Sequence, residues 1–150
     1  MSTCPADLWR AAHSSDFPNG PIIDGEPAEG ILYPTFEHKL IGTLPNGKPK
    51  YRKPDIKISD DDGKVRPGAG TSLFDKEKVF RGKAWRSFHI PKDTLVDPNL
   101  SITGPDYNEV FDANHYQIEP AKPMFPDVYK GALDNFARAA LAKAYELARS

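Results

Sequence analysis

Proline placement is the feature that most limits how this chain can fold. The chain has 150 residues and 15 of them are proline, against a usual share of about 5%. Nine prolines lie in residues 1–67, none lies in residues 68–90 and none follows Pro126. Proline fixes the backbone angle φ and has no amide hydrogen, so it avoids central strands and helix interiors. We therefore expect regular structure to concentrate in residues 68–90 and 127–150, and loops with short edge strands in residues 13–55.

Length and composition favour one domain over residues 1–150, loop-rich in residues 1–67 and carrying its motifs in residues 68–150. Eight Phe, six Tyr and two Trp can fill much of a core. The net charge is −1, from 20 basic and 21 acidic residues, which argues against a general binder of nucleic-acid phosphates. The balance leaves room for one phosphorylated small ligand held by one or two arginines.

The single cysteine, Cys4, excludes an internal disulfide. A nucleophilic Cys4 is one interpretation, but we expect it to lie in a frayed terminus. The first 30 residues lack an apolar run after a basic start, and no stretch approaches 18 consecutive apolar residues. We expect neither a secretory signal nor a membrane span, and hence a cytoplasmic protein or one that leaves by a route that reads no N-terminal signal.

Hydrophobic periodicity predicts an α+β fold. A helix over residues 127–148 follows from one apolar stripe, with Gly131 as its weak point. The stripe consists of Leu133, Phe136, Ala140, Leu141, Ala144 and Leu147. Short strands are predicted at residues 8–12 (which fit the start of a helix equally well), 51–59, 85–90 and 115–119. Turns are predicted at Asn46 with Gly47 and at Asp62 with Gly63.

The strand predicted at residues 115–119 alternates cleanly between two faces. Tyr116 and Ile118 point one way, and His115, Gln117 and Glu119 point the other. Such a strand is half-buried and presents three polar groups to a cleft or to water.

The common metal and nucleotide motifs are missing. The acids in residues 59–63 are contiguous, whereas a calcium loop needs oxygens at alternate positions. The four histidines lack metal-ligand spacing, so we predict no metal site. Residues 68–72 lack the lysine of a phosphate-binding loop and the third glycine of a dinucleotide fingerprint. A nucleophilic Ser72 with His115 as its base is an option that no Gly-x-Ser-x-Gly sequence frames.

Residues 70–75, Gly-Thr-Ser-Leu-Phe-Asp, permit two interpretations. Small residues let the backbone approach a ligand closely, and two adjacent hydroxyls at a strand end can bind that ligand. The same residues can cap a helix over residues 74–80. The local sequence alone favours the helix cap.

Several of these segments occur together, in order, in one protein family. They are residues 70–75, 88–91, 106–108, 114–118 with 120–124, and 133–136 with Arg138. In this order and spacing the chain resembles the type VI secretion effector toxins with an ADP-ribosyltransferase-like fold. The resemblance is close over residues 68–150. It is looser before them, where it rests on residues 8–11, 34–36, Arg52 and residues 54–56.

The resemblance implies a split, strongly bent sheet with NAD in the cleft between its halves. It implies that Arg10 meets the NAD phosphates or ribose, for which a guanidinium fork is suited; the alternative is an ordinary surface ion pair. Thr71 and Ser72 would brace the nicotinamide ribose, and Arg52 and His115 match positions linked to toxicity. The expected NAD contacts are Arg10, Thr71, Ser72, Tyr107 and His115. The expected catalytic residues are Ser72, His115, Thr71 and Arg52.

The resemblance also implies a function: a cytoplasmic toxin that transfers ADP-ribose from NAD to a macromolecule. A NAD glycohydrolase and a non-enzymatic binding module are the alternatives. Many ADP-ribosyltransferases hold the ribose with a glutamate, and this toxin family lacks a clear equivalent. Glu109 and Glu119 are candidates, although each also fits a surface carboxylate. The resemblance further implies an antitoxin that covers the cleft.

Overall fold

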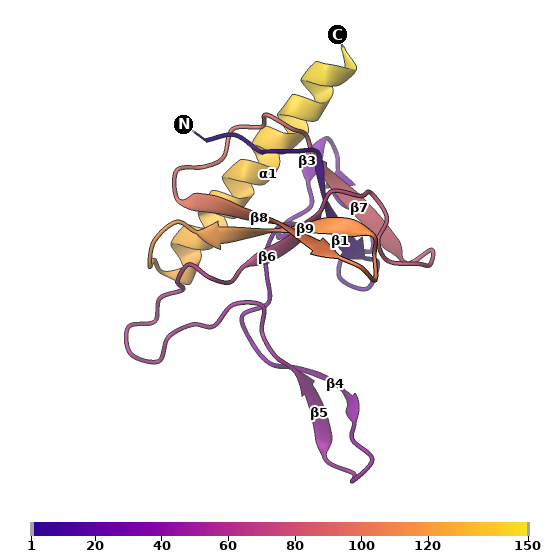
Figure 1. The fold of residues 1–150 in the computed structure, drawn as a ribbon, viewed down its shortest axis with the longest axis vertical. Coiled ribbons are helices and arrows are strands. Elements are labelled where there is room, and N and C mark those ends of the chain that lie inside the picture. Colours follow the sequence, from indigo (N-terminus) through magenta and orange to yellow (C-terminus); the bar gives the residue numbers. More distant parts are fainter. Residues whose placement is uncertain (1, 150) are drawn as a thin grey trace.

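The computed structural model describes residues 2–149, which form an antiparallel sheet, two small hairpins and a C-terminal helix (Figure 1). The main sheet has five strands in the order β7 (Trp85–Ile90), β1 (Leu8–His13), β6 (Thr71–Phe74), β9 (Ala113–Pro120) and β8 (Leu100–Asn108). One hairpin pairs β2 (Ile22–Ile23) with β3 (Glu26–Pro27), and the other pairs β4 (Lys39–Thr43) with β5 (Pro49–Arg52). The chain ends in α1 (Pro126–Ala148). The predicted α+β class with a C-terminal helix is confirmed.

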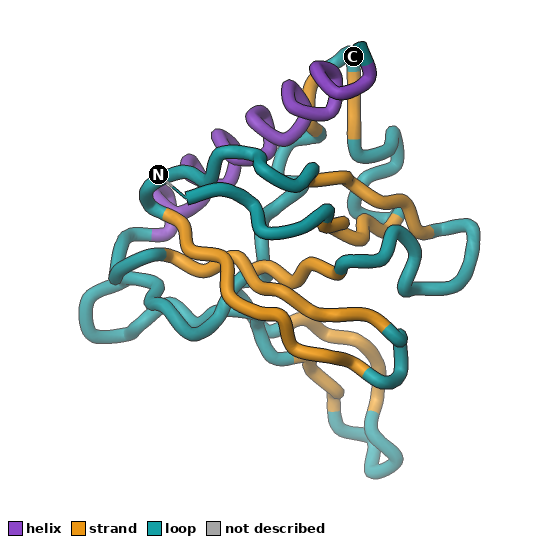
Figure 2. Tube along the Cα trace, turned by 45° about the horizontal axis from the view of Figure 1, so that its top comes forward, coloured by secondary structure: helices purple, strands orange, loops and turns teal. Residues whose placement is uncertain are grey.

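Helix α1 covers one side of the main sheet (Figure 2). Leu133, Phe136 and Ala140 are buried against the core, as the periodicity predicts. The stripe stops short of the helix end, because the last turns extend beyond the sheet and Leu147 is 50% exposed there. Most of the burial energy of α1 therefore comes from its first four turns.

The two longest strands lie where the proline distribution did not predict them. Strands β8 and β9 lie within residues 100–120, which include Pro105 and Pro120. Strand β8 is an edge strand, and Pro105 sits where its register with β9 shifts, between Thr103 and Asp106. An edge strand tolerates proline at such an irregularity because the missing amide hydrogen is not needed there.

Two predicted elements are wrong, and both lie near the middle of the chain. The strand predicted at residues 51–59 ends at Arg52, where β5 ends. Residues 74–80 form no helix, because Phe74 closes the central strand β6. The helix-cap interpretation of Thr71 and Ser72 is therefore also wrong. The turn at Asn46 and Gly47 is confirmed as the loop between β4 and β5.

Cys4 lies in the core rather than in a frayed terminus. Its amide donates to the Thr94 carbonyl at 2.8 Å, and its carbonyl accepts from the Asp93 amide at 2.9 Å. The thiol is 1% exposed, and burial raises the pKa of Cys4 to about 11. A thiol that stays protonated and buried is a poor nucleophile, so Cys4 contributes packing.

Gly70 serves packing between the sheet and the helix rather than close approach to a ligand. A Cβ atom on Gly70 would lie 1.9 Å from the Ile118 carbonyl oxygen and 2.8 Å from the Tyr129 hydroxyl. That hydroxyl donates to the Ile118 carbonyl at 2.7 Å. The position therefore excludes every side chain.

We predict that Gly70→Ala lowers the free energy of unfolding by about 2 kcal/mol, because the backbone at Ile118 must move. Gly131→Ala is the matched control, since nothing lies within 4 Å of its added Cβ. On an exposed helix that change should raise the free energy of unfolding by about 1 kcal/mol. Urea denaturation of both variants measures the two values. Equal effects would contradict the packing role of Gly70.

Candidate functional site

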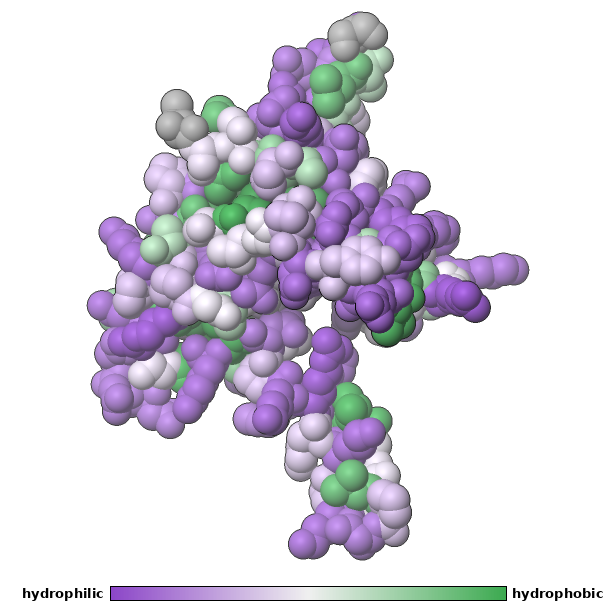
Figure 3. All heavy atoms as spheres, viewed as in Figure 1, coloured by the Kyte–Doolittle hydropathy of each residue, from purple (hydrophilic) through white to green (hydrophobic). Residues whose placement is uncertain are grey.

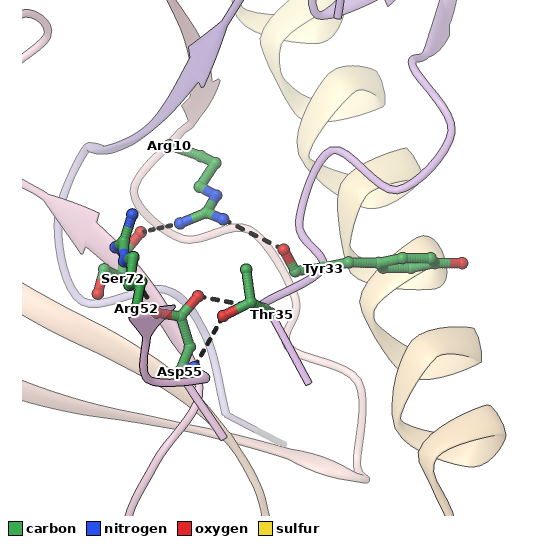
Figure 4. A network of polar contacts seen from close by, with 6 residues as sticks. All are labelled: Arg10, Tyr33, Thr35, Arg52, Asp55 and Ser72. Carbon is green, nitrogen blue, oxygen red and sulfur yellow. Dashed lines mark hydrogen bonds and ion pairs between the residues drawn. The ribbon is translucent and has the colours of Figure 1, made fainter. Parts of the chain in front are cut away.

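The main sheet opens between β1 and β6, and Arg10 spans the opening. Only one residue pair, Trp9 with Phe74, joins these strands, whereas β1 pairs along its whole length with β7. Arg10 Nη1 donates to the Ser72 carbonyl at 3.2 Å, and Nη2 donates to the Tyr33 carbonyl at 3.1 Å (Figure 4). The half-buried guanidinium has five N–H groups, so these two bonds leave donors for a ligand. Arg10 is not a surface ion pair.

A cavity of about 340 Å³ lies at this opening, within the usual size range of small-molecule sites. The charged part of its lining has four cations, Arg10, Lys39, Arg52 and Lys53, and two carboxylates, Asp16 and Asp55. Another part is aromatic: Phe17, Phe74, Phe80 and Trp85. A larger hollow of about 600 Å³ beside residues 56–69 contains none of the predicted site residues. The cavity at the opening is therefore the candidate site.

The aromatic wall was not predicted from the sequence. Phe80 stacks on Trp85 with ring centroids 4.5 Å apart, and Phe111 packs edge-on against Phe80 at 5.1 Å and against Phe74 at 5.3 Å. These rings come from three separate segments, so no sequence period marks them. Together they give the cavity an apolar part of its lining, built from rings that pack on one another.

Arg52 reaches the cavity from the base of the β4–β5 hairpin (Figure 4). Its side chain is 65% exposed and lies 3.9 Å from the Asp55 carboxylate. Asp55 and Thr35 clasp the two ends of the hairpin together. The Thr35 amide donates to Asp55 Oδ2 at 2.9 Å, and the Asp55 amide donates to Thr35 Oγ1 at 2.8 Å. The clasp fixes where the hairpin leaves the body, and hence where Arg52 stands.

Ser72 and His115 share one face of the sheet. Ser72 pairs with Gln117, and Phe74 pairs with His115. Ser72 lines the cavity, whereas His115 does not; its ring packs behind the lining residue Phe74, with centroids 5.3 Å apart. Burial lowers the pKa of His115, so its imidazole is neutral at pH 7. No hydrogen bond joins Ser72 to His115 among residues 2–149, so the structure does not assemble a serine–histidine nucleophile.

Thr71 and Tyr107 are not brought to the cavity. Thr71 is fully buried and its hydroxyl donates to the Leu32 carbonyl at 2.6 Å, which ties the loop after β3 to β6. Tyr107 pairs with Asn114 and therefore lies on the sheet face opposite to His115. Its hydroxyl donates to Asp112 at 2.6 Å. Thr71 can brace the site from behind, whereas Tyr107 stands away from it.

Glu119 is buried, contrary to the surface role that the sequence also allowed. It is 8% exposed, and its carboxylate accepts from the Gly68 amide at 2.7 Å, Thr103 Oγ1 at 2.6 Å and Gln117 Nε2 at 3.0 Å. Burial alone would raise the pKa of Glu119, but these three hydrogen bonds outweigh it and lower the pKa. Glu109 is exposed between β8 and β9. Neither carboxylate lines the cavity.

Residues 2–149 offer neither a metal site nor a membrane-spanning helix. These residues contain no cluster of three His, Cys, Asp or Glu side chains that could hold a metal ion. Within the same residues, no helix has the length and apolar character needed to cross a bilayer.

The sequence model of the Tse2 ADP-ribosyltransferase toxin matches residues 5–145. The chain belongs to this family. Toxin Tse2 of Pseudomonas aeruginosa is 38% identical to it over 144 residues, which cover 95% of the chain and 84% of that toxin. Membership in the Tse2 family confirms the resemblance found from the ordered motifs. It makes the chain an ADP-ribosyltransferase toxin with NAD as its substrate.

Every residue that lines the cavity falls inside the Tse2 family match, from Arg10 on β1 to Trp85 on β7. The matched region also includes the whole β4–β5 hairpin. The candidate site and the hairpin beside it are therefore both parts of the Tse2-family domain.

Proposed function

We propose that this toxin binds NAD in the cavity between β1 and β6 and transfers its ADP-ribose to a macromolecular acceptor in the cytoplasm. The observation that carries the proposal is the Arg10 guanidinium held across the opening, with a cationic and an aromatic wall beside it. As a toxin with a cytoplasmic site of action, it also needs an inhibitor in the cell that makes it. We propose an antitoxin that covers the cavity.

The cavity lining matches the chemistry of NAD in two respects. A pyrophosphate carries charged oxygens, which a guanidinium fork binds with good geometry. Arg10 supplies a fork that is already held in place, and Arg52 adds a second at the mouth. Nicotinamide and adenine are flat rings, and Phe80 and Trp85 offer ring faces of the same kind.

The transfer exchanges one bond at C1′ of the nicotinamide ribose. The bond from C1′ to the pyridinium nitrogen breaks, and neutral nicotinamide leaves with the bonding electron pair. An acceptor oxygen or nitrogen forms the new bond to C1′ and loses a proton. Ser72 braces the ribose from the cavity wall, and the neutral His115 imidazole accepts the proton. Thr71 supports Ser72 through its bond to Leu32.

We predict that Ser72→Ala lowers nicotinamide release about tenfold, because a hydroxyl that positions the ribose is lost. Ser101→Ala, on the exposed face of edge strand β8, is the matched control and should keep full activity. The measurement uses labelled NAD and purified protein, with and without a cell lysate. Transfer of label to a lysate macromolecule is expected.

Two outcomes of this assay would contradict the proposal. Nicotinamide release at the full rate without lysate, and no labelled macromolecule with it, would mean that water is the acceptor and the toxin is a NAD glycohydrolase. No release at all, with Ser72→Ala as toxic as the parent, would mean a binding module without NAD chemistry.

A further inference from the structure

A charged hairpin projects from the body of the protein (Figures 1 and 2). We call residues 38–53 the arm; it consists of β4, β5 and their connections. Every residue of the arm is exposed. An isolated two-stranded hairpin is marginally stable in water, so an arm whose strands contact mainly each other is suited to contact with another molecule.

The charge of the arm is entirely positive. It contains five basic residues and no Asp or Glu: Lys39, Lys48, Lys50, Arg52 and Lys53. Because the whole chain carries −1, the remainder carries −6. The side chains of the four lysines make no hydrogen bond or ion pair within residues 2–149. The arm is therefore a cluster of positive charge on an acidic protein body. The net charge of −1 for the whole chain does not reveal this separation.

The register gives the arm two different faces. Lys39 pairs with Arg52, and the next pair, Leu40 with Tyr51, points to the opposite face. Lys39, Arg52 and Lys53 line the candidate site, so the cationic face continues into the cavity. Leu40 and Tyr51 are 60% and 57% exposed, and apolar atoms stand free of the body along the arm in Figure 3.

We propose that the arm binds the phosphate backbone of a nucleic acid and holds it at the mouth of the cavity, so that the acceptor of ADP-ribose is a nucleic acid. This inference rests on the proposed function. The arm has the form that nucleic-acid grooves admit, a two-stranded ribbon. Its cations run from base to tip, as a repeating backbone charge requires.

The uncovered apolar face fits the same ligand. Tyr51 offers a ring on which a base can stack, and aliphatic side chains such as Leu40 can lie against sugars or wedge between bases. An acidic protein would also complement the positive charge of the arm. A nucleic-acid backbone additionally explains why the cations form a line from Lys50 through Arg52 to the proposed NAD site.

The direct test is fluorescence anisotropy with purified protein, without NAD. The probes are labelled oligonucleotides of about 20 residues, as single-stranded RNA and as duplex DNA, and polyglutamate of similar length as an acidic polypeptide. We expect at least one nucleic acid to bind at least about tenfold more tightly than polyglutamate. Neutralisation of about four phosphates should weaken binding on the order of a hundredfold between 50 and 200 mM salt.

Substitutions separate the contribution of the lysines to nucleic-acid binding from that of the apolar face. Lys48→Gln with Lys50→Gln should weaken binding about tenfold and flatten its salt dependence, because two phosphate contacts are lost. Lys92→Gln with Lys122→Gln changes the net charge equally on exposed lysines outside the arm and should leave affinity within about twofold. Tyr51→Ala should weaken binding about tenfold at every salt concentration, because stacking carries no charge.

A second experiment identifies the kind of macromolecule that carries the label. After reaction with labelled NAD and lysate, nuclease should release the label and protease should not. Lys48 and Lys50 do not line the cavity, so their double variant should release nicotinamide at the parent rate without lysate while transferring less label.

The two proposals fail in different ways. Absent oligonucleotide binding, equally tight polyglutamate binding, or label that only protease releases would overturn the nucleic-acid acceptor while NAD turnover persists. Absent nicotinamide release would overturn the proposed function, and this inference with it.

Discussion

Replacing Arg10 with alanine is expected to lower nicotinamide release from NAD at least about a hundredfold, the scale on which preorganised charge stabilisation acts. Arg10 is the one cavity cation held on two sides, by the Ser72 and Tyr33 carbonyls. Its position therefore does not depend on the ligand. Arg10→Lys should recover little of the activity, because an ammonium cannot span both carbonyls and still present a fork to phosphate. Single-turnover release measured at saturating NAD gives the comparison.

The control for this experiment must separate chemistry from folding. Arg10→Ala leaves two carbonyls without their donor and should cost about 1–2 kcal/mol of stability, so circular dichroism must first show a folded variant. Arg86→Ala is the matched change, since Arg86 lies on the neighbouring strand β7, is exposed and does not line the cavity. If Arg10→Ala retained activity within about threefold of Arg86→Ala, NAD would not bind where we propose.

Glu119→Ala is expected to lower the free energy of unfolding by about 3 kcal/mol, because Gly68, Thr103 and Gln117 all lose one acceptor. Glu109→Ala is the control; that carboxylate is exposed and should change stability by less than about 0.5 kcal/mol. Urea denaturation at pH 7 measures both. Activity per folded molecule then tests whether Glu119 also has a role in catalysis, since a bracing role alone leaves that value unchanged.

The same carboxylate gives the protein a defined acid sensitivity. The pKa of Glu119 is lower in the folded chain than its ordinary value of 4.5, so the unfolded chain binds a proton at a higher pH than the folded one. Its stabilisation is complete above the ordinary pKa and is lost as the pH falls through the lower folded-state pKa. The urea midpoint of the parent should therefore decrease as the pH falls below the ordinary pKa of 4.5. The decrease should be shallower in Glu119→Gln. Parallel profiles would contradict the assignment.

The parts of the fold that the sequence predicted are those with a buried face. Helix α1 and strands β1, β7 and β9 each bury one periodic set of side chains, which local patterns detect. Strand β8 is exposed over most of its length and carries no such signal. The arm strands are exposed on both faces, so only the turn at Asn46 and Gly47 could be predicted there.

The candidate site depended on the family resemblance rather than on local patterns. Arg10, Arg52 and Ser72 lie far apart in the chain, on β1, β5 and β6, and meet only in the folded protein. Tyr107 was expected with His115, but the two lie on opposite faces because the register shifts by one residue between Thr103 and Asp106. Pro105 marks the place of that irregularity but not its effect on the register. Membership in the Tse2 family supports the function, and the roles of individual residues stay predictions.

The strand order of the main sheet has a consequence for how the toxin comes into being. Leu8 on β1 faces Ile90 on β7, and β6 is held from its other side by β9, which starts at Ala113. Pairings between such distant segments form slowly, on the millisecond-to-second scale typical of non-local β topologies. During synthesis, Arg10 emerges long before the strands that give it a cavity. We therefore expect the candidate site to assemble only late in folding, after β9 has been synthesised.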